Sequence, residues 1–210
     1  MNLIDNVRKL IRRIMHIVAR YLNKISGGHV SPNSITIIGL IAHILVAYLI
    51  ATRHNLWAAG TLVIFGLFDT LDGELARLQK RASSAGMVLD ASTDRMKEVL
   101  LYSGAAYAFI ANGHPNMAVW AVAACGASLC VSYVKAKGEV AVKDSKLSAN
   151  EINRLFGDGV LRFEIRMFLL VIGLLSNHLA WAVIIIAVGS TLTAFGRLIR
   201  ITRKLSNAQN

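Results

Sequence analysis

SITIIGLIAHILVAYLIAT, residues 34–52, is a run of 19 residues without a lysine, arginine, aspartate or glutamate. A helix needs about 20 predominantly apolar residues to cross the hydrocarbon core of a bilayer. The run also lacks the charged face that a surface helix of a soluble protein carries. We therefore expect this segment to be a membrane-spanning helix.

Five more apolar runs predict five more spans. They cover residues 56–68, 99–111, 117–134, 167–176 and 179–195. Hydrophobic residues make up 55% of the 210-residue chain, whereas roughly 45–50% is usual for soluble proteins. The sequence therefore predicts an all-α fold, an integral membrane bundle of six transmembrane helices.

Three of these runs reach membrane length only when polar residues extend the helices. The second span continues through an aspartate-rich stretch to Leu78, the third begins at Gly86, and the fifth begins near Val160. We expect this transmembrane domain to cover residues 31–204, followed by a C-terminal tail at residues 205–210.

Residues 1–25 are predicted to form an amphipathic juxtamembrane helix ahead of the spans. Apolar residues recur there at steps of three and four, with arginines and lysines between them, namely Leu3, Val7, Leu10, Ile14, Val18 and Tyr21. Such a stripe either lies in the membrane interface or packs onto the bundle, and the sequence leaves both possibilities open.

The placement of basic residues predicts the orientation of the chain, which has a formal net charge of +11. Six spans put both termini and the loops at residues 78–86 and 135–160 on one side, where most lysines and arginines lie. The opposite loops carry only Arg53. The positive-inside rule makes the basic side cytoplasmic. We therefore expect a multi-pass protein of the cell (inner) membrane, whose basic residues meet anionic lipid headgroups and not nucleic acid.

Four carboxylates lie where the second and third spans meet. Asp69 and Asp72 are three residues apart, and Asp90 and Asp94 are four residues apart, so each pair shares one face of its helix. The short connection makes the two helices antiparallel neighbours, which lets the four side chains converge near the cytoplasmic end. Carboxylates this close repel one another in a low-dielectric setting. A divalent cation such as Mg²⁺ or Mn²⁺ resolves the conflict, because both prefer oxygen ligands.

Three residues beside these aspartates are suited to a phosphate-containing ligand. Gly73 and Gly86 have no side chain, so a ligand or a neighbouring helix can approach the backbone closely. Arg77, one turn after Gly73, is placed to contact a phosphate. The alternative is a purely structural ion-pair network of the aspartates with Arg77, Arg95 or Lys97.

The pattern Asp69-x2-Asp72-Gly73-x2-Ala76-Arg77-x8-Gly86-x3-Asp90-x3-Asp94 resembles the complete signature of the CDP-alcohol phosphatidyltransferase family. Eight fixed residue types at this spacing arise by chance in such a chain at roughly 1 in 10⁷ or less. The six predicted spans and the basic N-terminal helix are also similar to the family. The resemblance implies a phospholipid-synthesising enzyme that transfers a phosphatidyl-type group from a CDP-linked lipid to the hydroxyl of a polar alcohol and releases CMP.

The resemblance also implies a role for each signature residue. Asp69, Asp72 and Asp90 would hold two Mg²⁺ or Mn²⁺ ions, and Asp94 would touch a metal ion and act as the general base. The residues implied to bind CDP and its diphosphate are Asp69, Gly73, Arg77, Gly86, Ser83, Pro32, Asn33 and Thr36. The last three belong to a segment similar to the Pro-x3-Thr start of the first span in the family. A homodimer is a further implication.

Basic residues at the ends of the fourth, fifth and sixth spans predict a pocket for an anionic acceptor, because arginine binds phosphate well. The candidate acceptor-binding residues are Ser132, Lys135, Lys137, Arg162, Arg166 and Arg197. The segment 132–139 is similar to Ser-Tyr-x-Lys-Ala-Arg-x-Glu of the phosphatidylinositol phosphate synthases within the family, which implies inositol phosphate as the favoured acceptor. Lys137 stands where those enzymes have arginine. Snorkelling anchors are the alternative interpretation of these residues.

Other functions remain open on the sequence alone. Glycerol phosphate is an alternative acceptor. CDP-inositol is an alternative donor, because the sequence of residues 72–77 also resembles that of the di-inositol phosphate synthases. The donor lipid is either diacyl or archaeal ether. A membrane cation transporter would also place carboxylates in its spans. It would not need Gly73, Arg77 and Gly86 at fixed offsets.

Overall fold

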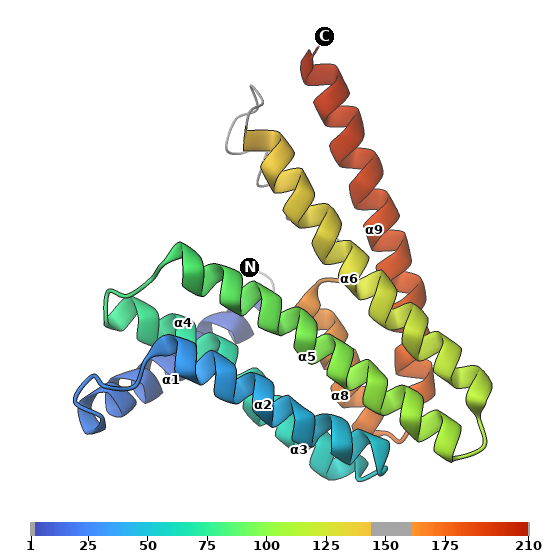
Figure 1. The fold of residues 1–210 in the computed structure, drawn as a ribbon, viewed down its shortest axis with the longest axis horizontal. Coiled ribbons are helices and arrows are strands. Elements are labelled where there is room, and N and C mark those ends of the chain that lie inside the picture. Colours follow the sequence, from blue (N-terminus) through green and yellow to red (C-terminus); the bar gives the residue numbers. More distant parts are fainter. Residues whose placement is uncertain (1–2, 144–160, 210) are drawn as a thin grey trace. The chain divides into compact units, whose positions relative to one another are not determined.

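The structure is a computed structural model that describes residues 3–143 and 161–209. Every regular element in these two ranges is an α-helix (Figure 1). The chain forms two compact units, Met1–Leu101 and Tyr102–Asn210. The predicted all-α fold is therefore confirmed.

The first unit contains α1 (Leu3–Ile25), α2 (Pro32–Ala51), α3 (Asn55–Gly66), α4 (Phe68–Leu78) and the first part of α5 (Ser84–Ala111). Helix α4 packs against both α1 and α2, and α2 also packs against α3 (Figure 1). The start of α2 is fixed by its cap, because the Ser31 Oγ accepts a hydrogen bond from the Ser34 N–H at 3.1 Å.

The expected second span consists of two helices. The helical pattern is interrupted at Leu67, whose N–H donates to the carbonyl of Ile64 at 3.2 Å, as in a tight 3₁₀ turn. Gly66, which has low helix propensity, immediately precedes this turn. The new helix α4 therefore begins one residue before Asp69 and carries both Asp69 and Asp72.

Helix α1 has two apolar stripes. One of them packs against α4 and the start of α2, in a core built from Met15, Ala19, Ile35, Leu71 and Leu75, with Ile11 and Leu22 beside it. The predicted stripe does not pack there, because Val7, Leu10, Ile14, Val18 and Tyr21 are 39–67% exposed. The predicted stripe is therefore exposed and does not pack in this core, and its place in the membrane interface stays a prediction.

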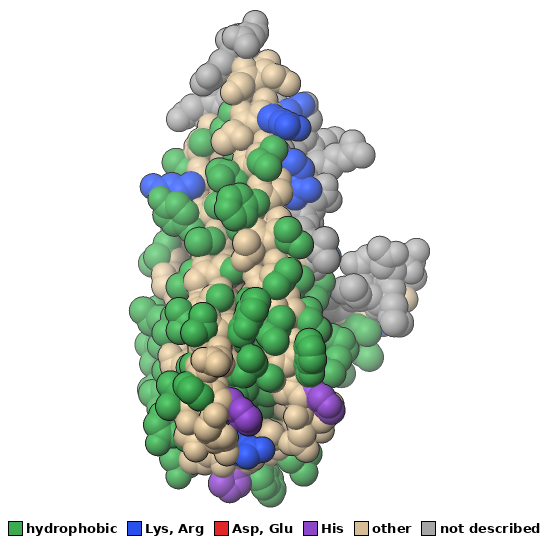
Figure 2. All heavy atoms as spheres, turned by 90° about the vertical axis from the view of Figure 1, so that its right-hand side faces the viewer, with side chains coloured by type: hydrophobic (Ala, Val, Ile, Leu, Met, Phe, Trp, Pro, Cys, Tyr) green, Lys and Arg blue, Asp and Glu red, His purple; other side chains and the backbone are tan. Residues whose placement is uncertain are grey.

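The second unit contains the remainder of α5 together with α6 (Pro115–Lys143), α8 (Phe163–Leu175) and α9 (Leu179–Gln209). Helix α9 packs against both α6 and α8. Helix α6 continues to Lys143, so the first part of the predicted 135–160 loop is helical, and residues 144–160 lie outside the described ranges. Figure 2 shows a face on which most side chains are hydrophobic.

Four segments of the described chain have the length and composition of membrane spans, namely Pro32–Ala51, Asn55–Leu78, Pro115–Ala141 and Leu179–Asn207. They correspond to the first, second, fourth and sixth expected spans. The third, α5, is 28 residues long but has a cluster of charged residues from Asp90 to Glu98. The described part of the fifth, α8, is 13 residues long. The chain is therefore a helical membrane protein.

Gly173 allows α8 to approach α9 closely. A Cβ at this position would lie 2.5 Å from the Cβ of Ala182 and 3.3 Å from the Cα of Leu179. Neither atom belongs to a flexible side-chain end, so the helices would have to separate. We expect Gly173→Ala to lower the free energy of unfolding in detergent by about 1–3 kcal/mol.

The matched control is Gly126→Ala on α6, where the added Cβ has no described atom within 4 Å apart from its chain neighbours and the nearby backbone of its own helix. Alanine is the better helix former, so this variant should match the wild type or exceed its stability by up to about 1 kcal/mol. Thermal unfolding that shifts equally in both variants would contradict the close approach at Gly173.

Candidate active site

A pocket of about 360 Å³ opens in the first unit, lined by side chains from α1, α2, α4, α5 and the α4–α5 loop. All eight residues for which the family resemblance implies CDP binding line it, namely Pro32, Asn33, Thr36, Asp69, Gly73, Arg77, Ser83 and Gly86. These residues span more than 50 positions of the sequence, and the packing of α4 against α2 brings them together.

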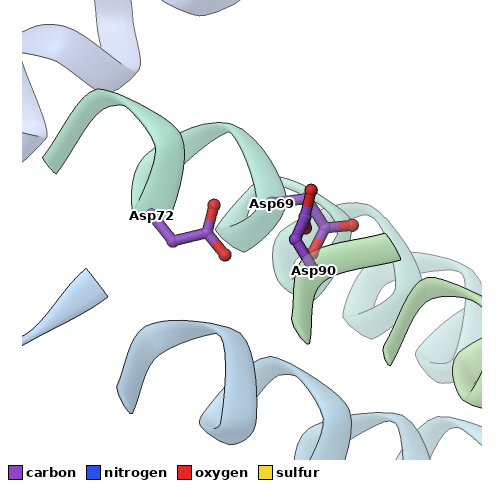
Figure 3. A group of neighbouring side chains, drawn as sticks. All are labelled: Asp69, Asp72 and Asp90. Atoms are coloured by element: carbon purple, nitrogen blue, oxygen red, sulfur yellow. The ribbon is translucent and has the colours of Figure 1, made fainter. Parts of the chain in front are cut away.

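Three of the four signature aspartates meet at this pocket. One carboxylate oxygen from each of Asp69, Asp72 and Asp90 lies within 4.8 Å of the others. Figure 3 shows the side chain of Asp72 directed toward Asp69 and Asp90, which come from α4 and α5 respectively. The i, i+3 spacing on α4 and the neighbouring helix α5 therefore bring together three of the four carboxylates that the sequence predicts to converge.

Two polar side chains hold this group of carboxylates in place. The Thr36 hydroxyl donates to Asp72 Oδ2 at 2.5 Å, and the Lys97 ammonium donates to Asp69 Oδ1. Lys97 is only 1% exposed. A buried lysine is costly unless it is paired, so its contact with Asp69 also fixes the orientation of that carboxylate.

The donor atoms of this group fit a divalent cation. The Oδ1 atom of Asp90 is buried and has no hydrogen-bond partner among the described residues. A buried carboxylate oxygen without a partner costs free energy. An ion such as Mg²⁺ or Mn²⁺ removes that cost, because both bind carboxylate oxygens. A structural ion-pair network explains the contacts of Asp69 but leaves Asp90 Oδ1 unsatisfied.

Asp94 is not part of the group of three. It lies one turn after Asp90 on α5, and its two oxygens are 3.4 Å from Lys97 Nζ and 3.5 Å from Arg95 Nη2. Lys97 therefore contacts both Asp69 and Asp94 and links the fourth carboxylate to one member of the group.

Arg77 is held at the edge of the pocket by a residue that the sequence did not single out. Its guanidinium donates to Glu74 Oε1 at 2.5 Å, and Glu74 Oε2 lies 3.3 Å from His16 Nδ1 of α1.

Gly86 forms a compact turn at the start of α5, where its N–H donates to the Ser83 hydroxyl at 3.1 Å. A Cβ on Gly86 would lie 3.3 Å from that hydroxyl, so glycine keeps this turn compact.

Two further arginines, Arg12 and Arg81, also line the pocket. The sequence offered only a weak signal for them, because α1 and the α4–α5 loop are rich in basic residues. Periodicity shows that Arg12 and His16 share a side of α1, but it does not show which helix that side meets.

The predicted acceptor-binding residues all lie in the second unit, and two of them are deeply buried. Arg166 and Arg197 are 1% and 3% exposed. Arg197 Nη1 donates to the carbonyl of Val131 at 3.0 Å, and its Nε has no hydrogen-bond partner in the described ranges. Burial of this kind differs from snorkelling, in which the charged head reaches water or lipid headgroups.

The other four candidates are less buried. Lys135 is exposed and lies 3.7 Å from Glu139, and Lys137 is also exposed. Ser132 donates to the carbonyl of Ser128 at 3.3 Å on α6, and Arg162 is the half-buried residue that precedes α8. The six candidates thus comprise two buried arginines and four more accessible residues.

Several relatives of this chain are named as synthases of inositol phosphate lipids. This chain is 35% identical to the phosphatidylinositol phosphate synthase of Cutibacterium acnes, over 60% of this chain and 63% of that protein. It is 24% identical to the archaetidylinositol phosphate synthase of Pyrococcus horikoshii, over 97% of this chain and 98% of that protein. The match to the first of these spans less than two thirds of the relative's length.

Solved structures share the fold of this chain. A Mycobacterium tuberculosis phosphatidylinositol phosphate synthase with CDP-DAG bound aligns with a TM-score of 0.76 at 24% identity, over 90% of this chain and 94% of that chain. The same enzyme in complex with manganese and citrate aligns with a TM-score of 0.75 at 23% identity, over 90% and 88%.

The family profile described as CDP-alcohol phosphatidyltransferase matches residues 29–195, which is more than half of the sequence. These residues include the signature Asp69–Asp94 and every residue that lines the pocket except Arg12, so the chain belongs to the CDP-alcohol phosphatidyltransferase family.

Proposed function

We propose that this chain transfers a phosphatidyl-type group from a CDP-linked lipid to a phosphorylated polar alcohol, with inositol phosphate as the favoured acceptor, and releases CMP. The observation that carries the proposal is the pocket in which Asp69, Asp72 and Asp90 converge beside Gly73 and Arg77. Inositol phosphate as the acceptor is supported by the relatives, which are named as inositol phosphate synthases. Their named products are both phosphatidyl and archaetidyl lipids, so both kinds of donor lipid stay open.

In this proposal Asp69, Asp72 and Asp90 hold the divalent cations, Mg²⁺ or Mn²⁺, and two ions are expected. When bound, such ions neutralise the donor's diphosphate and stabilise the departing oxygen of CMP. The manganese in the similar M. tuberculosis structure supports a divalent metal. Arg77, oriented by Glu74, contacts the diphosphate, and Gly73 and Gly86 leave room for the cytidine nucleotide.

Asp94 is the proposed general base. The acceptor hydroxyl loses its proton to Asp94 while its oxygen bonds to the distal phosphorus of the donor's diphosphate. The bond from that phosphorus to the bridging oxygen breaks, and the oxygen leaves with CMP. Lys97 and Arg95 hold the Asp94 carboxylate in a fixed orientation, which a base needs to reach the hydroxyl within hydrogen-bond distance.

Arg166 and Arg197 are the proposed centre of the acceptor site. Arg197 is buried, and its Nε has no hydrogen-bond partner in the described ranges. A buried guanidinium is costly without a counter-charge, and the phosphate of an inositol phosphate supplies one. Lys135, Lys137, Arg162 and Ser132 complete this site in the proposal as its more accessible members.

The decisive experiment measures CMP release by the purified protein in detergent with Mg²⁺ and CDP-diacylglycerol or its archaeal ether analogue. Inositol phosphate, glycerol phosphate, serine and free inositol are supplied separately as acceptors, and CDP-inositol replaces the lipid donor in a parallel series. We expect release that depends on inositol phosphate and stops with EDTA. Release with glycerol phosphate alone would reassign the acceptor, and no release from any donor would favour the cation transporter.

The proposal also includes an inner-membrane location with the active site facing the cytoplasm, because the basic N-terminal helix and the α4–α5 loop border the pocket. The homodimer expected from the family resemblance stays a prediction, which the mass of the protein in detergent would test.

A further inference from the structure

Helix α1 is fixed on α4 by polar contacts as well as by its buried apolar stripe. His16 Nδ1 lies 3.3 Å from Glu74 Oε2. After α4 ends, Gln79 Nε2 donates to Asn23 Oδ1 at 2.8 Å and to the carbonyl of Val30 at 2.9 Å. A helix that only rested on a membrane surface would need none of these contacts. They define the rotation of α1 about its own axis.

That rotation turns Arg12 toward the pocket. Arg12 lies one turn before His16 on the side of α1 that meets α4, and it lines the pocket together with Asp72, Arg77 and Arg81. The next residue, Arg13, is rotated by about 100° around the helix. Both arginines are exposed, but Arg13 is not among the residues that line the pocket.

The arginines of the pocket differ in the contacts they already make. Arg77 is engaged by Glu74 at 2.5 Å, and Arg81 Nη1 lies 3.4 Å from Gln79 Oε1. Within residues 3–143 and 161–209, no hydrogen bond or ion pair is found for Arg12. Its five N–H donors are therefore available to a ligand in the pocket.

We propose that Arg12 binds a phosphate oxygen of the donor's diphosphate, so that α1 belongs to the donor site and is not only a membrane anchor. The inference rests on the proposed function. A guanidinium matches the geometry of a phosphate and forms two parallel hydrogen bonds to it. The exposed apolar stripe of the same helix is suited to the membrane interface, which is where the headgroup of a CDP-linked lipid lies. One helix thus contacts the bilayer and the headgroup together.

The test compares Arg12→Gln with the matched control Arg13→Gln in the full-length protein, in mixed micelles of a neutral detergent. Two quantities are measured: the KM for CDP-diacylglycerol, and the affinity for water-soluble CDP by titration calorimetry with Mg²⁺. We expect Arg12→Gln to weaken both by roughly 10- to 100-fold, as for the loss of a charge-assisted hydrogen bond. Arg13→Gln should change each by less than about twofold. Arg12→Lys should recover part of the loss, because lysine restores the positive charge but cannot form the two parallel hydrogen bonds of a guanidinium.

Soluble CDP separates headgroup binding from membrane anchoring, because CDP has no lipid tails. Unchanged CDP affinity in Arg12→Gln, or equal effects of the Arg12 and Arg13 variants, would overturn the role of Arg12. Thermal unfolding that matches the wild type excludes a folding defect as the cause of weaker binding. Wild-type protein that releases no CMP from any CDP-linked lipid would instead contradict the proposed function, and the CDP titration would still decide the role of Arg12.

Discussion

Asp90→Asn is expected to abolish high-affinity binding of divalent cations and with it CMP release. The substitution keeps the size of the side chain and removes one of three charges that lie within 4.8 Å of one another. It breaks no hydrogen bond at Asp90 Oδ1, which has none in the described part of the chain. We expect the affinity for Mn²⁺ to fall by at least about 100-fold, which corresponds to about 2.8 kcal/mol.

Calorimetric titration with Mn²⁺, or the electron paramagnetic resonance signal of free Mn²⁺, measures this affinity without any turnover. Glu164→Gln is the control, because Glu164 is an exposed carboxylate at the start of α8 and its loss should leave Mn²⁺ binding unchanged. If Asp90→Asn bound Mn²⁺ as tightly as the wild type, the three aspartates would not be the metal site.

Asp94→Asn is expected to lower kcat by roughly 10²- to 10⁴-fold, the range typical for loss of a general base. Asp94 lies outside the group of three aspartates, so Mn²⁺ affinity and the KM for the donor should change far less than in Asp90→Asn. This separation of kcat from metal affinity distinguishes a base from a metal ligand. Steady-state CMP release at saturating donor and acceptor measures it.

Ser92→Ala is a suitable control for Asp94→Asn, since Ser92 is an exposed residue on the same turn of α5. It should retain wild-type kcat. Full turnover by Asp94→Asn would refute the assignment of the base. A loss of Mn²⁺ binding as large as that of Asp90→Asn would instead make Asp94 a metal ligand.

Hydrophobic runs predicted most of the fold because a bilayer imposes a simple rule on length and composition. Four spans follow that rule directly. The second differs in one respect, since it breaks at Leu67 just before Asp69. The low helix propensity of Gly66 and the packing of α4 against α1 and α2 outweigh the continuous apolar pattern there.

The partners of the site residues were harder to predict than the site residues themselves. Lys97 was only one of three cations that could pair with the aspartates, and its contacts with Asp69 and Asp94 depend on how α5 lies against α4. Glu74 was not singled out as a site residue, because it occupies an unspecified position of the signature between Gly73 and Ala76. Its contact with His16 joins residues 58 positions apart.

The amino-acid sequence by itself determined the membrane-spanning helices, the pairing of Asp69 with Asp72 and the family signature. These follow from hydropathy and from spacing along a single helix, which fix which residues share a face. Only the tertiary structure decided which stripe of α1 is buried, and therefore that Arg12 and not Arg13 lines the pocket. The rotation of one helix against another depends on side-chain packing and on buried polar contacts between distant segments, and periodicity along the chain does not contain that information.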